Sequence, residues 1–278
     1  MHKVLEVRDL SKRYGVGCDQ CFDLTGPEHE TNVCPRCGSV VAASNVSFDL
    51  YAGEILGIMG ESGSGKSTAV KCLNFDEVPS SGSATYYGVE SPTGLSMFEL
   101  NRAQQRYLAT QQFGMVYQNP HLGLNFEISA GGNIAERLLV SGNYNYSAIR
   151  NRAIDLLRRT EVLPERMDEL PKNFSGGMQQ RVQIAKALAT NPPLLLLDEV
   201  TTGLDLSVQA AILDLILEIQ QQSKTAMIVV THDLGVIRLL ADRTLVMKYG
   251  HVIESGLTDQ ILEDPQQPYT QRLVASAL

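Results

Sequence analysis

The chain has 278 residues, of which 44% are hydrophobic, and its formal net charge is −8. This apolar content supports a sizeable core and excludes a disordered chain, and the acidic balance argues against a nucleic-acid partner. No apolar run approaches the roughly 18–20 residues of a membrane span, and the first residues lack the apolar stretch of a signal peptide. We therefore expect a soluble, cytoplasmic protein.

Hydrophobic periodicity predicts an α/β fold with a parallel sheet. Strands are predicted at 3–10, 46–51, 55–59, 84–87, 194–197, 226–231, 244–248 and 251–255. Helices are predicted at 68–74, at 207–222 and through most of 98–186, where 150–160 is the clearest amphipathic piece. Ala52-Gly53 and Tyr249-Gly250 are turn signals between strands.

Residues 60–67 read GESGSGKS and fit the phosphate-loop pattern G-x-x-x-x-G-K-[ST] between a predicted strand and a predicted helix. The glycines allow successive N–H groups to surround a phosphate, Lys66 reaches the β- and γ-phosphates, and Ser67 is a Mg²⁺ ligand. The alternative is a Gly/Ser-rich turn with a solvated lysine. The predicted phosphate site comprises Gly60, Glu61, Ser62, Gly63, Ser64, Gly65, Lys66, Ser67 and Thr68.

Residues 194–199 read LLLLDE, an apolar strand that ends in two carboxylates. Asp198 would lie at the carboxyl edge of the sheet beside the phosphate loop and bind Mg²⁺. Glu199 follows and is placed to activate a water as general base. A pair of acidic residues at a helix N-terminus is the alternative.

Residues 174–181 read FSGGMQQR, in which Ser175 is a suitable N-cap for a helix that continues through Ala189. The N–H groups of Gly176 and Gly177 then form a second phosphate-binding helix end. Two such ends predict a nucleotide held between two copies of the fold, so a single chain should be nearly inactive.

These motifs, with LLLLDEVTTGLD and VVTHD in the same order, resemble an ATP-binding-cassette (ABC) ATPase over essentially the whole chain outside 15–43. The resemblance implies a Mg²⁺-dependent ATPase, one domain over 1–278, with a RecA-like parallel-sheet core, an antiparallel β subdomain and a helical signature subdomain at about 98–180. Its expected partner is a second cassette, either an identical copy or a paralogue.

The resemblance also implies roles for single residues. Gln118 would ligate Mg²⁺ and sense the γ-phosphate, Asp205 would be the D-loop aspartate, and His232 the catalytic switch histidine. Tyr14 would stack on adenine. Ser175, Gly176 and Gly177 would contact ATP held by the partner chain. The alternatives are a strand-end tyrosine at 14, a loop amide at 118 and a core histidine at 232.

One residue departs from the family pattern. Val200 follows Glu199 where relatives usually have proline, which fixes φ and removes a donor. We expect valine to keep an extended backbone there, with function intact and a slightly looser D-loop.

Two branches of the family match different segments. The tail at 264–273, DPQQPYTQRL, resembles the ATPases of peptide and nickel importers, which act with transmembrane permeases. Residues 128–142, ISAGGNIAERLLVSG, together with the segment around HDLGVIRLLADR, are more similar to the K-type ATPase of the bacterial carbon–phosphorus lyase system. That similarity implies ATP hydrolysis coupled to a soluble lyase core in phosphonate catabolism, and the importer ATPase remains the alternative.

Four of the five cysteines form two C-x-x-C pairs within residues 15–43. The spacing predicts a structural Zn²⁺ held by Cys18, Cys21, Cys34 and Cys37. An iron–sulfur cluster and reduced, unliganded thiols are the alternatives. His29 is expected to be a solvated loop residue and Cys72 a small buried one. We expect this zinc-knuckle insert to join the first two strands near the adenine side, as a docking surface or a staple for a long loop.

Overall fold

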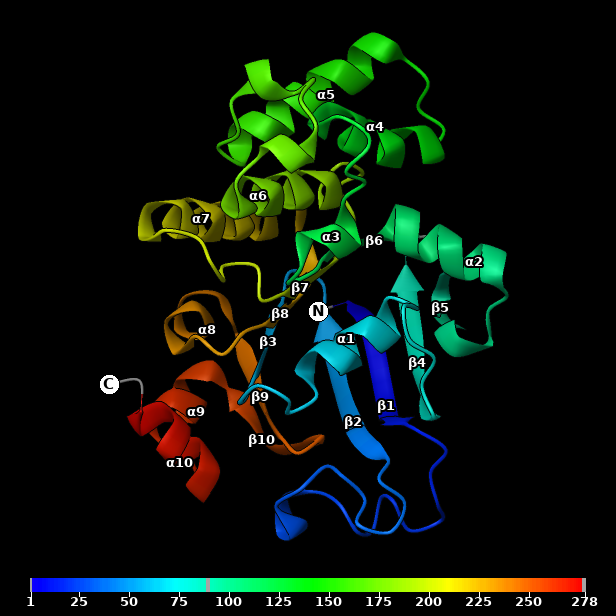
Figure 1. Ribbon diagram of the computed structural model, residues 1–278, viewed down its shortest axis with the longest axis vertical. Helices are drawn as coiled ribbons and strands as arrows, with labels where there is room; N and C mark the ends of the chain where they lie inside the picture. Colours follow the sequence, from blue (N-terminus) through cyan, green and yellow to red (C-terminus); the bar gives the residue numbers. More distant parts are fainter. Residues whose placement is uncertain (1, 89–90, 277–278) are drawn as a thin grey trace. The chain divides into compact units, whose positions relative to one another are not determined.

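The computed structural model describes residues 2–88 and 91–276, and its chain divides into two compact units. The first unit comprises Met1–Asn101 and Ala226–Leu278, and the second comprises Arg102–Thr225. Figure 1 gives the element labels used below. Among the described residues, no helix combines the length and the apolar character that a membrane span requires.

An antiparallel sheet in the first unit has the strand order β2-β1-β4-β5. Its strands are β1 (Lys3–Tyr14), β2 (Val40–Tyr51), β4 (Ser81–Gly88) and β5 (Ser91–Ser96). The first two exceed their predicted lengths, because Lys12 pairs with Ala43 and Tyr14 with Val40. Residues 15–39 therefore join β1 to β2 beyond their paired ends, whereas residues 40–43 of the predicted insert belong to β2; Figure 1 shows the connection as blue loops.

A second sheet of the first unit places three parallel strands side by side. The strand β3 (Ile55–Met59) lies between β8 (Ala226–Val230) and β9 (Arg243–Lys248), and β10 (His251–Leu257) pairs antiparallel with β9. All residues of β3 and β8 are buried, as their continuous apolar runs predict. Tyr249 and Gly250 both have positive φ and form the predicted hairpin turn.

Helices cover these sheets. They are α1 (Lys66–Leu73), α8 (Leu234–Leu240), α9 (Thr258–Glu263) and α10 (Pro268–Ala275). Met59, Ile237, Val246, Ile261 and Tyr269 form a buried cluster that joins β3 and β9 to α8, α9 and α10. Cys72 is fully buried in α1, as predicted, and this burial raises the pKa of its thiol to about 11.

The second unit is mainly helical and contains one parallel strand pair. Its helices are α2 (Arg102–Tyr107), α3 (Pro120–Gly123), α4 (Ala130–Val140), α5 (Tyr146–Arg159), α6 (Gly176–Ala187) and α7 (Leu206–Ser223). The strand β7 (Leu194–Asp198) was predicted, whereas β6 (Phe113–Val116) interrupts a region expected to be largely helical. These strands pair in parallel, with Val116 beside Leu197.

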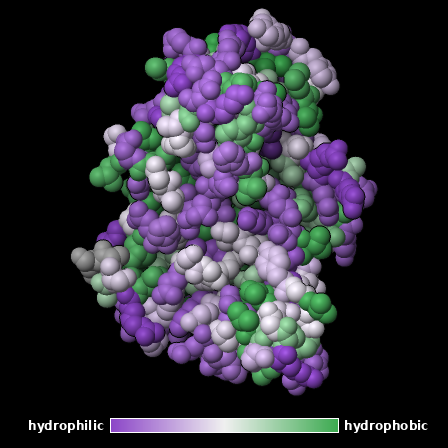
Figure 2. Space-filling view, viewed as in Figure 1, coloured by the Kyte–Doolittle hydropathy of each residue, from purple (hydrophilic) through white to green (hydrophobic). Residues whose placement is uncertain are grey.

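Short helical turns complete the chain at Pro27–His29, Met97–Glu99, Leu108–Gln112, Pro164–Arg166 and Pro171–Asn173. Polar residues predominate on the face shown in Figure 2, and apolar ones are scattered among them.

Candidate functional site

The phosphate loop leaves the carboxyl end of β3 and leads directly into α1. Gly60 and Gly65 both have positive φ, at 147° and 105°. A Cβ at Gly60 would lie 2.2 Å from the Met247 carbonyl oxygen, and one at Gly65 would lie 1.9 Å from that of Ala42. Only glycine meets both demands, because it lacks a Cβ and readily adopts positive φ.

Lys66 is folded over this loop. Its side chain is buried, and Nζ donates to the carbonyl oxygens of Gly60 at 2.7 Å and Glu61 at 2.8 Å. The ammonium group thus closes the loop through neutral acceptors, at the start of the helix whose N–H groups point into the same loop. The predicted alternative of a solvated lysine is wrong. Ser67 and Thr68 occupy the first turn of α1, where both are half-buried.

Tyr14 ends β1 close to α1. Burial, the largest influence, raises the pKa of Tyr14, and the side chain of Thr68 opposes this shift. The ring is 38% exposed, and Lys12 Nζ lies 4.8 Å from its centroid. Tyr14 is therefore partly open to solvent near the first turn of the phosphate-loop helix.

His232 lies at the same sheet edge as the phosphate loop. The parallel pairing of β3 and β8 brings Thr231 N within 3.2 Å of Ile58 O, and His232 is the next residue. His232 is exposed, so the alternative of a core histidine is wrong. Asp233 N-caps α8, since its Oδ1 accepts from Gly235 N at 2.7 Å and Val236 N at 3.2 Å. The cap fixes the backbone next to the histidine.

Tyr269 contacts the phosphate loop, although the sequence predicts no role for it. Its hydroxyl accepts a hydrogen bond from Glu61 N at 3.0 Å, and Lys248 Nζ lies 4.9 Å from its ring centroid. Burial, the largest influence, raises the pKa of this tyrosine. The Pro-Tyr start of α10 was the available signal, but nothing local relates it to residue 61.

In the second unit, the parallel pairing of β6 and β7 places Gln118 at the same edge as Asp198 and Glu199. Asp198 is buried, and Gln118 Nε2 donates to Glu199 Oε2 at 2.6 Å. Glu199 has a φ of 51°, a left-handed conformation that costs a non-glycine residue about 1–3 kcal/mol. Such strain is typical of functional positions.

The residue after Glu199 differs from our expectation. Val200 is buried and lies in a turn, not in extended backbone. The reason is local: the left-handed Glu199 reverses the chain, and its carbonyl oxygen accepts from Thr202 N at 3.2 Å.

The FSGGMQQR segment forms the predicted capped helix. Ser175 Oγ accepts from Met178 N at 3.3 Å at the start of α6. Asp205 likewise caps α7, since its Oδ1 accepts from Val208 N at 3.0 Å, and this bond is the largest of several that lower its pKa. Both caps, with Gly176, Gly177 and Gln118, line one hollow of about 430 Å³.

Two glutamines of α6 hold the segment that carries Gln118. Gln183 Oε1 accepts from Tyr117 N at 2.7 Å, and Gln183 Nε2 donates to Tyr117 O at 3.0 Å. Gln180 Nε2 donates to the same carbonyl oxygen at 3.3 Å. The sequence predicts a role for neither glutamine. The buried side of α6 therefore positions the residue before Gln118.

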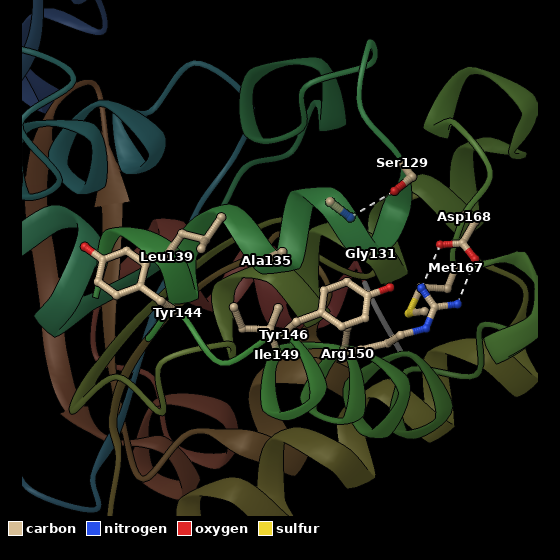
Figure 3. A pocket seen from close by; sticks show the side chains of 12 residues that line it. Ser129, Gly131, Ala135, Leu139, Tyr144, Tyr146, Ile149, Arg150, Met167 and Asp168 are labelled. Carbon is tan, nitrogen blue, oxygen red and sulfur yellow. Dashed lines mark hydrogen bonds and ion pairs between the residues drawn. The ribbon is translucent and has the colours of Figure 1, made fainter. Parts of the chain in front are cut away.

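A further hollow, of about 340 Å³, lies between α4 and α5 (Figure 3). Its lining is mostly apolar and aromatic and includes Leu139, Tyr144, Tyr146, Ile149 and Met167. At one end, the guanidinium group of Arg150 binds both carboxylate oxygens of Asp168, at 3.1 and 2.8 Å. Much of the lining belongs to residues 128–142, the segment that resembles the lyase-associated ATPase.

The four clustered cysteines meet in the insert, with all sulfur atoms within 4.8 Å of one another. The separations are 3.6 Å for Cys18–Cys21, 3.7 Å for Cys18–Cys34 and 3.3 Å for Cys21–Cys37, too long for disulfides. A tetrahedral ion with Zn–S bonds of about 2.3 Å requires S···S distances near 3.8 Å. The donor set therefore fits zinc.

The surroundings of the cysteine cluster also suit thiolate ligands. Hydrogen bonds from Ser39, first from its side chain, lower the pKa of Cys37 to about 6, and Cys21 Sγ accepts from Cys18 N at 3.1 Å. Cys21 and Cys34 are buried with Val41. His29 is exposed on the turn Pro27–His29, as predicted.

Comparison with known proteins bears on the whole chain. The family model described as ABC transporter matches residues 43–202, beginning where the insert ends. PhnK of Escherichia coli strain K12, a protein named for phosphonates utilization and ATP binding, is 50% identical over 235 residues, which are 84% of this chain and 91% of PhnK. The oligopeptide transport ATP-binding protein OppD of Bacillus subtilis strain 168 is 40% identical over 241 residues, 86% of this chain and 67% of OppD.

A solved structure extends the similarity to the fold. The ATP-binding cassette MJ0796, in a dimeric post-hydrolysis state with ADP and Pi, has a TM-score of 0.77 and 27% identity, covering 91% of this chain and 98% of its own. The predicted P-loop ATPase fold and the resemblance to the K-type ATPase are thereby confirmed. The chain belongs to the ABC transporter family and is one of its ATP-binding cassettes.

Proposed function

We propose that this chain binds and hydrolyses ATP as one half of a cassette dimer and acts with a soluble carbon–phosphorus lyase core in phosphonate catabolism. The observation that carries the proposal is the 50% identity to PhnK over 91% of that protein's length. A cytoplasmic location is part of this proposal. So is the single cassette domain over 1–278, with a helical subdomain at about 98–180 and the insert at 15–43.

The proposed nucleotide contacts follow the motif residues. N–H groups of residues 60–68 and Lys66 Nζ bind the phosphates, and Tyr14 stacks on adenine. Lys66 already lies over the loop, with hydrogen bonds to two of its carbonyl oxygens, so it only has to exchange acceptors. Bound Mg²⁺ would be held by Ser67, Gln118 and Asp198, and it would neutralise charge on the transferred phosphoryl group.

Glu199 is the proposed general base. Gln118 Nε2 donates to its carboxylate at 2.6 Å, which holds the Glu199 side chain in a defined orientation. The amide oxygen of Gln118 would bind Mg²⁺, so the same side chain would contact both the general base and the metal ion. His232 would stabilise the γ-phosphate, and its exposure beside the phosphate loop supports this role.

A second cassette completes the proposed site. Ser175, Gly176 and Gly177 present N–H groups at the start of α6, where a helix end attracts an anion. Asp205 caps the neighbouring α7, and the next residue, Leu206, is 84% exposed, which suits burial against a partner. The dimeric cassette MJ0796 supports this arrangement.

The insert is proposed to hold one structural Zn²⁺. Four thiols at 3.3–3.7 Å from their neighbours, two of them buried, form a closed donor set. Metal analysis of purified protein should give about one equivalent. Less than about half an equivalent, unchanged by Cys34→Ser plus Cys37→Ser, would contradict the zinc assignment.

An importer ATPase is the second candidate, favoured by the 40% identity to OppD. Co-purification from the native cell, followed by identification of the partners, separates the two. Soluble lyase subunits are the expected result, whereas recovery of transmembrane permease subunits would overturn the lyase proposal. Glu199→Gln, which should trap the closed dimer, gives the bait, and Lys66→Ala gives a matched bait that should not close.

A further inference from the structure

The cysteine insert reaches the phosphate loop. Asn32 Nδ2 donates a hydrogen bond to the carbonyl oxygen of Gly63 at 3.3 Å, and both residues belong to the first unit. Gly63 stands in the middle of the loop with a φ of 81°. Because a peptide group is planar and trans, holding the Gly63 carbonyl also fixes the direction of the Ser64 N–H. That N–H belongs to the predicted phosphate cradle.

The cysteine cluster holds the backbone of Asn32. Val41 N donates to Asn32 O at 2.8 Å, and Val33 forms a β-bridge with Val40. Cys34, a proposed metal ligand, is only two residues further on, and its N–H donates to Ser39 O at 2.8 Å. Asn32 therefore lies on a short hairpin, and the turn of that hairpin begins at Cys34, one of the clustered cysteines.

A second path joins the same cluster to the loop. Val41 packs in a buried cluster with Cys21 and Cys34. The carbonyl oxygen of the next residue, Ala42, lies so near Gly65 that a Cβ there would be 1.9 Å away. The strand that leaves the cysteines thus passes directly against the end of the loop where α1 begins.

Regular secondary structure is sparse in this insert. Within residues 15–39, the structure shows turns, isolated bridges and the single helical turn Pro27–His29. A metal ion that joins four thiolates would supply much of the order, since metal binding to such a segment is coupled to its folding. Without the ion, the position of Asn32 is less constrained.

We propose that Asn32 is a positioning residue that couples metal binding at the cysteine cluster to nucleotide binding at the phosphate loop. This inference rests on the proposed zinc site and the proposed ATP site. Thermodynamic linkage makes the coupling reciprocal: zinc strengthens nucleotide binding, and nucleotide strengthens zinc binding by the same factor. The expected factor is roughly three to ten, the range for one net hydrogen bond.

The test uses the full chain and a non-hydrolysable ATP analogue. Analogue affinity is measured by calorimetry for wild-type protein with zinc, for zinc-stripped protein and for Cys34→Ser plus Cys37→Ser. Wild-type affinity should fall roughly three- to tenfold when zinc is absent. Asn32→Ala should keep one zinc but bind the analogue as weakly as zinc-free protein, and further zinc removal should change little. Glu28→Ala, an exposed change on the same insert, should match wild type.

The zinc dependence of affinity is the deciding quantity, because a merely structural role for Asn32 would leave that ratio unchanged. Equal analogue affinity with and without zinc, or an unaltered zinc dependence in Asn32→Ala, overturns the coupling while both parent sites stand. Wild-type protein that holds no zinc, or binds no analogue, overturns the corresponding parent proposal as well. If the zinc-free chain unfolds, zinc-loaded Asn32→Ala alone decides, through its affinity and its zinc release with and without analogue.

Discussion

Replacing Gln183 by leucine should loosen the segment that carries Gln118. Gln183 is buried on α6, and its amide makes two hydrogen bonds to the backbone of Tyr117, at 2.7 and 3.0 Å. Leucine has a similar volume but offers neither bond. The Tyr117 N–H loses its 2.7 Å acceptor, while Tyr117 O keeps the donor from Gln180 at 3.3 Å.

The cost follows from these losses and from the loss of the bond that Gln183 Nε2 donates to Gln180 Oε1 at 3.2 Å. A partly buried N–H that loses its acceptor costs about 1–3 kcal/mol, and the shared carbonyl loses about 1 kcal/mol. Burial of the more apolar leucine offsets some of this, so we expect Gln183→Leu to destabilise the chain by about 2–3 kcal/mol. For a chain of this size, that lowers Tm by about 5–10 °C. Turnover should also fall by about tenfold to a hundredfold, because Gln118 positions Glu199.

The assay is thermal unfolding of zinc-loaded protein, with steady-state ATP hydrolysis measured on the same samples. Gln180→Leu is the matched control, because it removes the longer bond to Tyr117 O and the same Gln183–Gln180 bond but leaves the Tyr117 N–H paired. It should cost about 1 kcal/mol and lower Tm by about 2–4 °C. The reasoning would be refuted if the Tm of Gln183→Leu equalled that of the wild-type protein or exceeded that of Gln180→Leu.

Three further changes test the proposed site. Glu199→Gln should lower turnover by about 10²–10⁴ while keeping ATP binding and trapping a closed dimer, seen by gel filtration; wild-type turnover would refute a base at this position. Lys66→Ala should weaken nucleotide binding at least tenfold by calorimetry, because the ammonium group over the loop is lost. Tyr269→Phe removes the acceptor of Glu61 N and should weaken nucleotide binding roughly fivefold. As a control, the variant should unfold at the same temperature as the wild-type protein. Unchanged nucleotide affinity would show that this bond does not shape the loop.

Most strands could be predicted from the sequence, those with a continuous apolar run most directly, whereas the short strands Ser91–Ser96 and Phe113–Val116 could not. Leu194–Asp198 and Ala226–Val230 are buried on both faces, so every residue carries the signal. The strand Phe113–Val116 has only four residues between helices, and its Gly114 is required because a Cβ would lie 2.7 Å from Ala187 O. That demand comes from tertiary packing, which local periodicity does not reveal.

The candidate site shows the same division. Lys66, Asp198 and Ser175 could be assigned because their motifs place them at the ends of strands and helices. Their supports could not be assigned: Gln183 acts on a residue 66 positions away, and Tyr269 on one 208 positions away. In both bonds the side chain accepts from a backbone N–H, a group that every residue except proline offers. No pattern in the sequence marks the receiving position.

In the insert, the metal ligands could be predicted from the sequence, but the contacts with the phosphate loop could not. Cysteine spacing predicts the donor set because metal geometry restricts where thiols stand, yet the spacing is silent on what lies against the knuckle. We expected the adenine side, and the insert does begin just after Tyr14, but the structure also brings it onto the phosphate loop through Asn32 and Ala42. Ala42 acts through its carbonyl oxygen, which any residue offers. Asn32 is the side chain whose identity matters, so a change there separates a mere staple from a link between metal and nucleotide.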